Sequence, residues 1–157
     1  MKNWEVLIES SFDAGLHEDV ARYAVLAALE AEDMECNGEV SVSFVNDDEM
    51  KNLNYEYRFI NETTDCLSFP QYSKEELAGI RVRGGFVHLG DIVISLDRAY
   101  QQAAEYGFGI DREVAFLTIH SLLHLLGYDH DDTEGEKIMF DYQEVILAKM
   151  GLGRNDD

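Results

Sequence analysis

The feature of this chain that most constrains its fold is a strongly apolar helical segment, expected to begin at Asp111 as its cap and to run to about Leu126. Its apolar residues surround the helix axis and do not form a single stripe. A helix that is apolar on all sides is buried, so we predict that this one lies at the centre of the domain. His120 and His124 interrupt it four residues apart, a spacing that places both imidazoles on one face, one turn apart.

A third histidine follows in the run HSLLHLLGYDH. Gly127 is expected to end the helix, because glycine adopts the left-handed conformation without a Cβ clash, and the turn can then carry His130 back to the same point. Three neutral imidazoles with an open fourth position are the ligand set of a catalytic zinc, whereas structural zinc sites are closed by four protein ligands. We therefore predict one Zn²⁺ per chain, held by His120, His124 and His130. The alternative is three core histidines with satisfied nitrogens.

The same run matches the HExxHxxGxxH pattern of metzincin zinc peptidases, except that Ser121 stands where those enzymes have their general base, glutamate. A serine is too short to replace that carboxylate, and its hydroxyl is not a general base near neutral pH. The predicted site is therefore metzincin-like in its ligands, while peptide hydrolysis is disfavoured.

Length and composition indicate a single domain spanning residues 1–157, with one proline and no apolar run long enough to cross a bilayer. The amino terminus becomes charged too early for a secretory signal. Cys36 and Cys66 lie in dissimilar contexts, so we expect packed thiols in a reducing cytosol rather than a disulfide. These features favour a cytoplasmic protein without a membrane partner.

The periodicity predicts strands at residues 4–8, 39–45, 65–69 and 88–95, and helices at 18–32, 48–57, 95–106, 111–126 and from 132 or 133 to 150. Residues 71–87 lack strong periodicity and are expected to form a long surface loop, with at most one helical turn near Lys74. This order indicates an α+β fold with one mixed four-stranded sheet and about five helices, whose strand order the pattern does not give. Several residues of the last helix are expected to pack inward, namely Ile138, Met139, Tyr142, Val145 and Ile146.

The formal net charge of −20 should repel nucleic acid, so any contact with RNA must be local. Cationic residues are concentrated in the middle of the chain, at Arg58, Lys74, Arg81, Arg83 and Arg98, whereas acidic residues crowd beyond the histidine motif, at Asp129, Asp131, Asp132, Glu134 and Glu136. Because it contains Arg81 and Arg83, the predicted loop is a candidate to border a binding site for an acidic polymer. An ordinary solvated loop is the alternative.

The run HSLLHLLGYDH, together with YRFINETTDCLSFP at residues 57–70 and LGDIVIS at residues 89–95, resembles the YbeY family of bacterial rRNA maturation factors. The resemblance covers most of the chain. It implies a largely parallel sheet with one antiparallel strand, and a zinc-dependent endoribonuclease specific for single strands, acting in 16S rRNA 3′-end maturation and ribosome quality control. His120, His124 and His130 match the metal ligands of the family, and Arg58 matches its functional arginine. Ser121 stands where many members have glycine.

The resemblance also implies roles for Arg58 and His120 in catalysis, although the local sequence of Arg58 by itself is more typical of a solvated surface arginine. Asp129 and Asp131 could transfer protons, orient a ligand imidazole or lie in solvent, and the sequence leaves these three roles open. The implied partners are single-stranded RNA and small-subunit rRNA, with ribosomal proteins or an assembly GTPase as further candidates. Two other functions remain as alternatives: a non-catalytic, metal-stabilised ribosome assembly factor and a metallopeptidase.

Overall fold

The computed structural model describes residues 3–34, 36–83, 85–129 and 131–154. These residues form four strands, β1 (Trp4–Ser10), β2 (Asn37–Val45), β3 (Cys66–Pro70) and β4 (Phe86–Ser95). They also form six helices, α1 (Leu16–Ala31), α2 (Asp47–Arg58), α3 (Lys74–Arg83), α4 (Leu96–Tyr106), α5 (Ile110–Leu125) and α6 (Thr133–Lys149). All four predicted strands and all five predicted helices are present, with ends shifted by a few residues.

The strands form one sheet in the order β1-β2-β4-β3. β1 pairs with β2 in parallel, with Val6 opposite Val40, and β2 pairs with β4 in parallel, with Val42 opposite Ile92. β3 pairs with β4 in the antiparallel direction. The α+β fold and the mixed sheet with one antiparallel strand are thus confirmed, and β3 is an edge strand.

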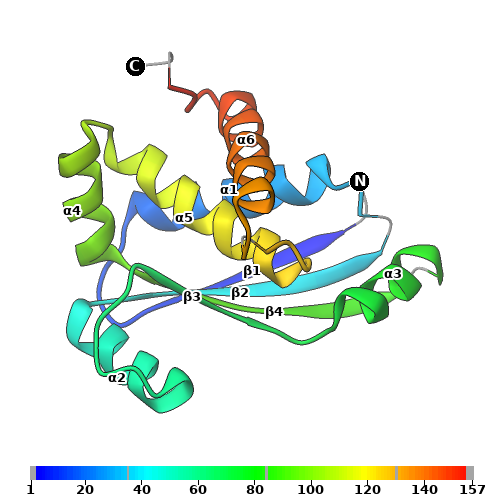
Figure 1. Cartoon of the computed structure of the whole chain (residues 1–157), viewed down its shortest axis with the longest axis horizontal. Coiled ribbons are helices and arrows are strands. Elements are labelled where there is room, and N and C mark those ends of the chain that lie inside the picture. Colours follow the sequence, from blue (N-terminus) through cyan, green and yellow to red (C-terminus); the bar gives the residue numbers. More distant parts are fainter. Residues whose placement is uncertain (1–2, 35, 84, 130, 155–157) are drawn as a thin grey trace.

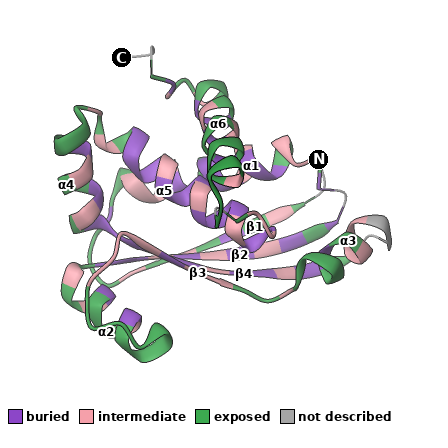
Figure 2. Cartoon of the chain, viewed as in Figure 1, coloured by how far each residue is buried: buried purple, intermediate pink, exposed green. Residues whose placement is uncertain are grey.

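One face of the sheet is covered by α1, α4 and α5, with α6 packed on the outer side of α1 and α5, while α2 lies against the other face (Figure 1). α5 contacts α1, α4 and α6 as well as strands β3 and β4, so it is the helix around which the main core is built. Figure 2 shows buried residues along the length of α5, which confirms the central position predicted from its composition. A second, smaller cluster lies under α2 and consists of Val45, Met50, Leu67 and Val93.

The helix ends follow local capping chemistry. Asn46 caps α2 by accepting a hydrogen bond from the Glu49 N–H at 2.8 Å, and Asp132 caps α6 by accepting one from the Gly135 N–H at 2.6 Å. The predicted cap of α5 is wrong, because Gly109 occupies that position and Asp111 lies inside the first turn. There its carboxylate stabilises the positive end of the helix dipole.

The predicted surface loop at residues 71–87 is also wrong, because most of it forms α3, a helix in addition to the five predicted. Ser73 and Glu76 form a capping box: the Glu76 N–H donates to Ser73 Oγ at 3.1 Å and the Ser73 N–H donates to Glu76 Oε1 at 3.0 Å. Gly79 and the β-branched Ile80 and Val82 lower the intrinsic helix propensity, which obscured this signal.

None of the helices that the described residues form is long and apolar enough to cross a membrane. Cys36 and Cys66 are both free thiols, and both pack in or against the main core, as predicted.

Candidate metal centre and its surroundings

His120 and His124 lie on α5 with their Nε2 atoms 3.1 Å apart. Both side chains are half-buried, and the centroids of their rings are 4.6 Å apart. The predicted convergence of these two imidazoles is therefore confirmed. It follows from the helical period, which brings residues four apart onto one face.

This pair fits a shared metal ion. Two imidazole nitrogens bound to one Zn²⁺ at about 2.0–2.1 Å and a tetrahedral angle would lie roughly 3.4 Å apart, close to the observed separation. His130, the predicted third ligand, lies outside the described residues, and those that are described contain no group of three histidine, cysteine or acidic side chains arranged to hold a metal. The zinc site with its metzincin-like ligand set therefore stays a prediction.

The buried side chain of Gln143 holds the His120 ring in place. Gln143 on α6 is 2% exposed, and its Oε1 lies 3.2 Å from His120 Nδ1. A neutral imidazole that donates its Nδ1 proton to this oxygen keeps its Nε2 lone pair directed at His124 and at a shared cation.

Gln143 was missed because the stripe predicted for the last helix counted only apolar residues. Met139 and Ile146 are buried and Tyr142 packs against the core, as predicted, whereas Ile138 and Val145 are 56% and 51% exposed, so that part of the prediction is wrong. The signal was available, because Gln143 interrupts an otherwise apolar stripe.

Ser121 is buried, and its hydroxyl lies beside the thiol of Cys66 on β3. Burial raises the pKa of that thiol above its usual range, so it remains neutral. The residue after His120 therefore serves helix–sheet packing and provides no general base, as the sequence indicated.

Arg58 ends α2 and lies against the edge strand β3. Its Nη2 donates to the carbonyl oxygen of Ser68 at 2.8 Å, and its Cζ lies 5.0 Å from the centroid of the Phe69 ring. The residue is exposed, so these two contacts orient the guanidinium while most of its N–H groups face solvent. Because α5 also packs against β3, this strand connects Arg58 to the helix that carries the histidines.

The other predicted cations lie mainly on α3. Arg81 donates from Nη2 to Glu32 Oε1 at 2.9 Å, while Lys74 is exposed at the start of the helix. The side chain of Arg83 lies outside the described residues. α2 and α3 lie at opposite ends of the sheet (Figure 1), so Arg58 lies at one end and Lys74 and Arg81 at the other, while Arg98 lies on α4.

Asp129 and Asp131 are both exposed, and the Asp131 N–H donates to Asp129 Oδ1 at 2.9 Å. This bond shapes the turn that follows α5. The proton-transfer and imidazole-orienting roles of these carboxylates remain predictions.

Glu113 is a carboxyl group that sequence reasoning missed. It lies seven residues before His120, so it shares the histidine face of α5, and it is 4% exposed. Burial, reinforced by the charge of Asp65 and opposed by that of Arg112, raises the pKa of Glu113 to about 7. Its charge therefore changes near neutral pH.

Comparison with known proteins gives a consistent result. The family model described as Endoribonuclease YbeY matches residues 8–151. The chain is 43% identical over 150 residues to the endoribonuclease YbeY of Caldanaerobacter subterraneus subsp. tengcongensis, covering 93% of this chain and 95% of that one. It is 44% identical over 130 residues to the protein of the same name from Clostridioides difficile, covering 83% of each.

A solution structure of a Thermotoga maritima protein has the same fold, with a TM-score of 0.62 at 22% identity, covering 97% of this chain and 95% of that one. The extent of the family match and the identity to these relatives agree with the resemblance seen in the sequence motifs. The chain belongs to the endoribonuclease YbeY family.

Proposed function

We propose that this protein is a zinc-dependent endoribonuclease that cleaves single-stranded RNA in the cytoplasm, and that its physiological substrate is small-subunit rRNA during 16S 3′-end maturation and quality control. The observation that carries the proposal is the pair of Nε2 atoms 3.1 Å apart on a buried helix, in a chain of this family. His120, His124 and His130 would hold the ion.

A bound Zn²⁺ supplies a Lewis acid and lowers the pKa of water toward neutrality. The protein supplies the positions. α5 is buried on nearly every side, which fixes both imidazoles, and Gln143 fixes the tautomer of His120.

Arg58 would bind the scissile phosphate. The guanidinium has five N–H donors in a planar fork that matches two phosphate oxygens, and only one of its nitrogens is bonded to Ser68. Its positive charge would stabilise the additional negative charge that develops on the phosphate during cleavage.

The central test is cleavage of a single-stranded RNA by the full-length protein with added Zn²⁺ and after chelation. We expect His124→Ala to lower the zinc-dependent rate by about 100-fold or more, because one ligand of the ion is removed. His17→Ala is the matched control, since His17 lies on α1 and its ring nitrogen bonds to Tyr100. Equal cleavage by chelated and zinc-loaded protein would exclude the proposed chemistry. Loading with nickel, copper or iron in parallel identifies the cation that supports the highest rate.

Arg58 is tested in the same assay. Arg58→Ala should reduce the rate by about 10²- to 10³-fold, and Arg58→Lys should recover only part of it, because an ammonium lacks the planar fork. Full activity in Arg58→Lys would show that a point charge suffices.

Gln143 is a positioning residue, and its test includes metal binding. Gln143→Leu should weaken zinc affinity by about tenfold, as loss of a ligand's supporting hydrogen bond generally does, and it should lower activity in proportion. Competition with a chromogenic chelator measures the affinity. Unchanged affinity would assign Gln143 to packing alone.

A non-catalytic assembly factor is the second candidate, because the strong negative charge of the chain disfavours an RNA-binding enzyme. In that case rRNA processing in cells would continue with folded His124→Ala protein. A metallopeptidase would instead cleave unfolded protein and stop on chelation.

A further inference from the structure

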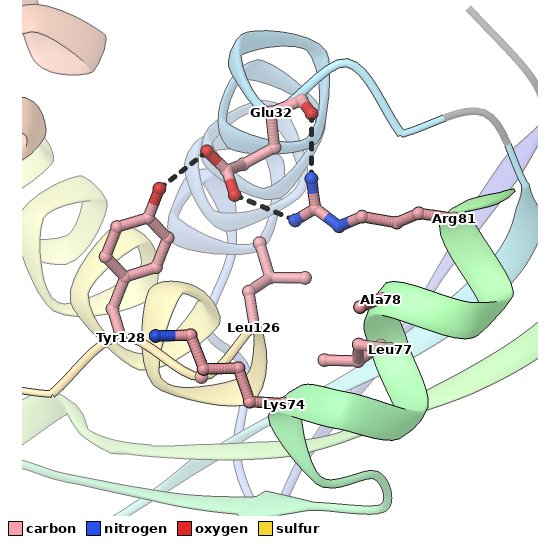
Figure 3. Close-up of a pocket in the computed structure, with 8 residues that line it drawn as sticks. Glu32, Lys74, Leu77, Ala78, Arg81, Leu126 and Tyr128 are labelled. Atoms are coloured by element: carbon pink, nitrogen blue, oxygen red, sulfur yellow. Dashed lines mark hydrogen bonds and ion pairs between the residues drawn. The ribbon is translucent and has the colours of Figure 1, made fainter.

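A pocket of about 340 Å³ lies between α3 and the turn that follows α5, the helix of His120 and His124 (Figure 3). This volume falls within the range of about 300–1,000 Å³ that is usual for small-molecule sites. Its lining combines cations, a carboxylate and apolar side chains, contributed by Glu32, Lys74, Leu77, Ala78, Arg81, Leu126, Gly127 and Tyr128.

The polar side is organised around Glu32, the C-cap of α1 and the first residue of the α1–β2 turn. Its Oε1 accepts from Arg81 Nη2 at 2.9 Å, and its Oε2 accepts from the hydroxyls of Tyr128 at 2.9 Å and Tyr142 at 2.7 Å. Arg81 Nη1 also donates to the Glu32 carbonyl oxygen at 3.3 Å. The Arg81 guanidinium is therefore held in one orientation, yet the side chain stays 34% exposed and retains N–H groups for a ligand.

Lys74 supplies a second cation. A Cβ placed at Gly127 would lie 3.1 Å from Lys74 Cγ, so the lysine stem packs across the turn, and Figure 3 shows its amine extending toward Tyr128. Within the described parts of the chain, none of the ion pairs includes Lys74. With two cations and one carboxylate, the residues that line the pocket carry a formal charge of +1 in a chain whose net charge is −20.

The apolar side is a wall between the two cations. Leu77 and Leu126 are 2% and 5% exposed, and Ala78 continues the wall toward solvent. The Tyr128 ring closes it, fixed by the bond from its hydroxyl to Glu32. A simple anion would use the cations alone, whereas a nucleotide would use the cations for its phosphate and the wall for its base.

We propose that this pocket binds one unpaired nucleotide of the RNA substrate, with the phosphate on Lys74 and Arg81 and the base against Leu77, Leu126 and Tyr128. The inference rests on the proposed function and deepens it. A base held in a duplex stack cannot enter such a pocket, whereas a base in a single strand can be splayed out and packed on protein side chains. The pocket therefore gives a physical cause for single-strand specificity beside the turn that leaves the histidine helix.

The charge part of the proposal is tested by fluorescence anisotropy with a labelled single-stranded RNA in the presence of a chelator, so that no cleavage occurs. Lys74→Gln should raise Kd about five- to tenfold at low salt and reduce the slope of log K against log salt by about 0.7, the value for one phosphate contact on a single strand. Lys51→Gln is the matched control, because Lys51 is an exposed lysine on α2. Its Kd should stay within twofold of the unaltered protein.

The base part is tested with RNAs that each lack one base. We expect the affinity of the unaltered protein for RNA to fall about fivefold or more when the base is missing at one particular position of the strand. This loss corresponds to about 1 kcal/mol of stacking. Ala78→Phe fills the pocket from its exposed rim and leaves both cations in place. This variant should bind the intact RNA as weakly as the unaltered protein binds the RNA lacking that base.

The outcomes separate the two proposals. If RNA is cleaved in a zinc-dependent way but Lys74→Gln and Ala78→Phe bind it like the unaltered protein, the pocket proposal is overturned and the proposed function stands. If Lys74→Gln instead loses binding of polyglutamate while RNA binding is unchanged, the pocket takes an acidic peptide and the nucleotide assignment is wrong. If single-stranded RNA is neither bound nor cut, the proposed function itself fails.

Discussion

Besides Arg58 on α2, the proposed RNA site is carried by α5 and α3, and these two helices are held in the fold by different forces. α5 is buried on nearly all sides by apolar contacts with three helices and two strands. α3 is largely exposed and is attached through Leu77 and through the ion pair between Arg81 and Glu32 (Figure 2). The comparison indicates that the groups that must stay fixed lie in the core, while the groups that meet a substrate lie on a lightly attached surface helix.

The largest expected effect comes from truncating a core leucine of α5. Leu122→Ala should lower the free energy of unfolding by about 3–4 kcal/mol, because a fully buried side chain leaves a cavity that the packed surroundings cannot fill. Leu77→Ala on α3 should lower the free energy of unfolding by about 2 kcal/mol. It should speed amide hydrogen exchange mainly within that helix, since α3 can open locally. Denaturant unfolding measures the loss of stability in each variant, and hydrogen exchange shows where the amides become exposed. If both variants lose the same free energy of unfolding and exchange faster throughout the chain, α3 is not more lightly attached than α5.

A smaller effect is expected from Glu32→Gln, which removes the carboxylate that holds α3. Loss of the partly exposed ion pair with Arg81 and of the charge-assisted hydrogen bonds should lower the free energy of unfolding by about 1–2 kcal/mol. Burial, together with the hydrogen bond to Glu32 and the charge of Glu32, raises the pKa of Tyr128 to about 12. Because burial remains in the variant, that pKa should fall only part of the way toward its usual value of about 10. Ultraviolet titration of the tyrosines would detect the change, and an unchanged titration would contradict the assigned role of Glu32.

The last expected effect, no larger than that of Glu32→Gln, sharpens the description of α5, whose core includes one titratable carboxyl. The pKa of Glu113 in the folded chain, about 7, lies above its unfolded value of about 4.5. As pH rises between these values the unfolded state ionises first, so folding stability contributed by the neutral carboxyl is complete below pH 4.5 and is lost as pH approaches 7. Glu113→Gln should therefore stabilise the protein by about 1–2 kcal/mol at pH 8 and by almost nothing at pH 4.5. Urea unfolding at both pH values tests this, and a gain of equal size at both would rule out titration as the cause.

The fold was predictable where burial dictated the pattern. The all-round apolar composition of α5 specified a central helix, and alternation specified β2. The predictions failed where weak local signals were decided by tertiary contacts. α3 has low intrinsic propensity but a capping box and one buried leucine. On α6 the apolar pattern correctly placed Met139 and Ile146 inside, but it wrongly added Ile138 and Val145 and passed over the polar Gln143.

The candidate site divides in the same way. His120 and His124 lie on one face of α5 because they are four residues apart on a helix. The motif lacks the general base of the metzincin peptidases because Ser121 replaces their glutamate. The pairing of Arg58 with β3, and the support of His120 by Gln143, join residues whose contact no local pattern specifies.

The amino-acid sequence by itself determined the four strands, every helix except α3, the burial of α5 and the two imidazoles on one face, because these depend on periods of two or 3.6 residues. Only the tertiary structure decided that Glu32, Arg81 and Tyr128, which belong to separate elements of the chain, meet around one pocket next to that helix. The physical reason is that periodicity acts over a few residues, whereas the packing of α1 and α3 against the α5–α6 turn depends on how the whole core closes.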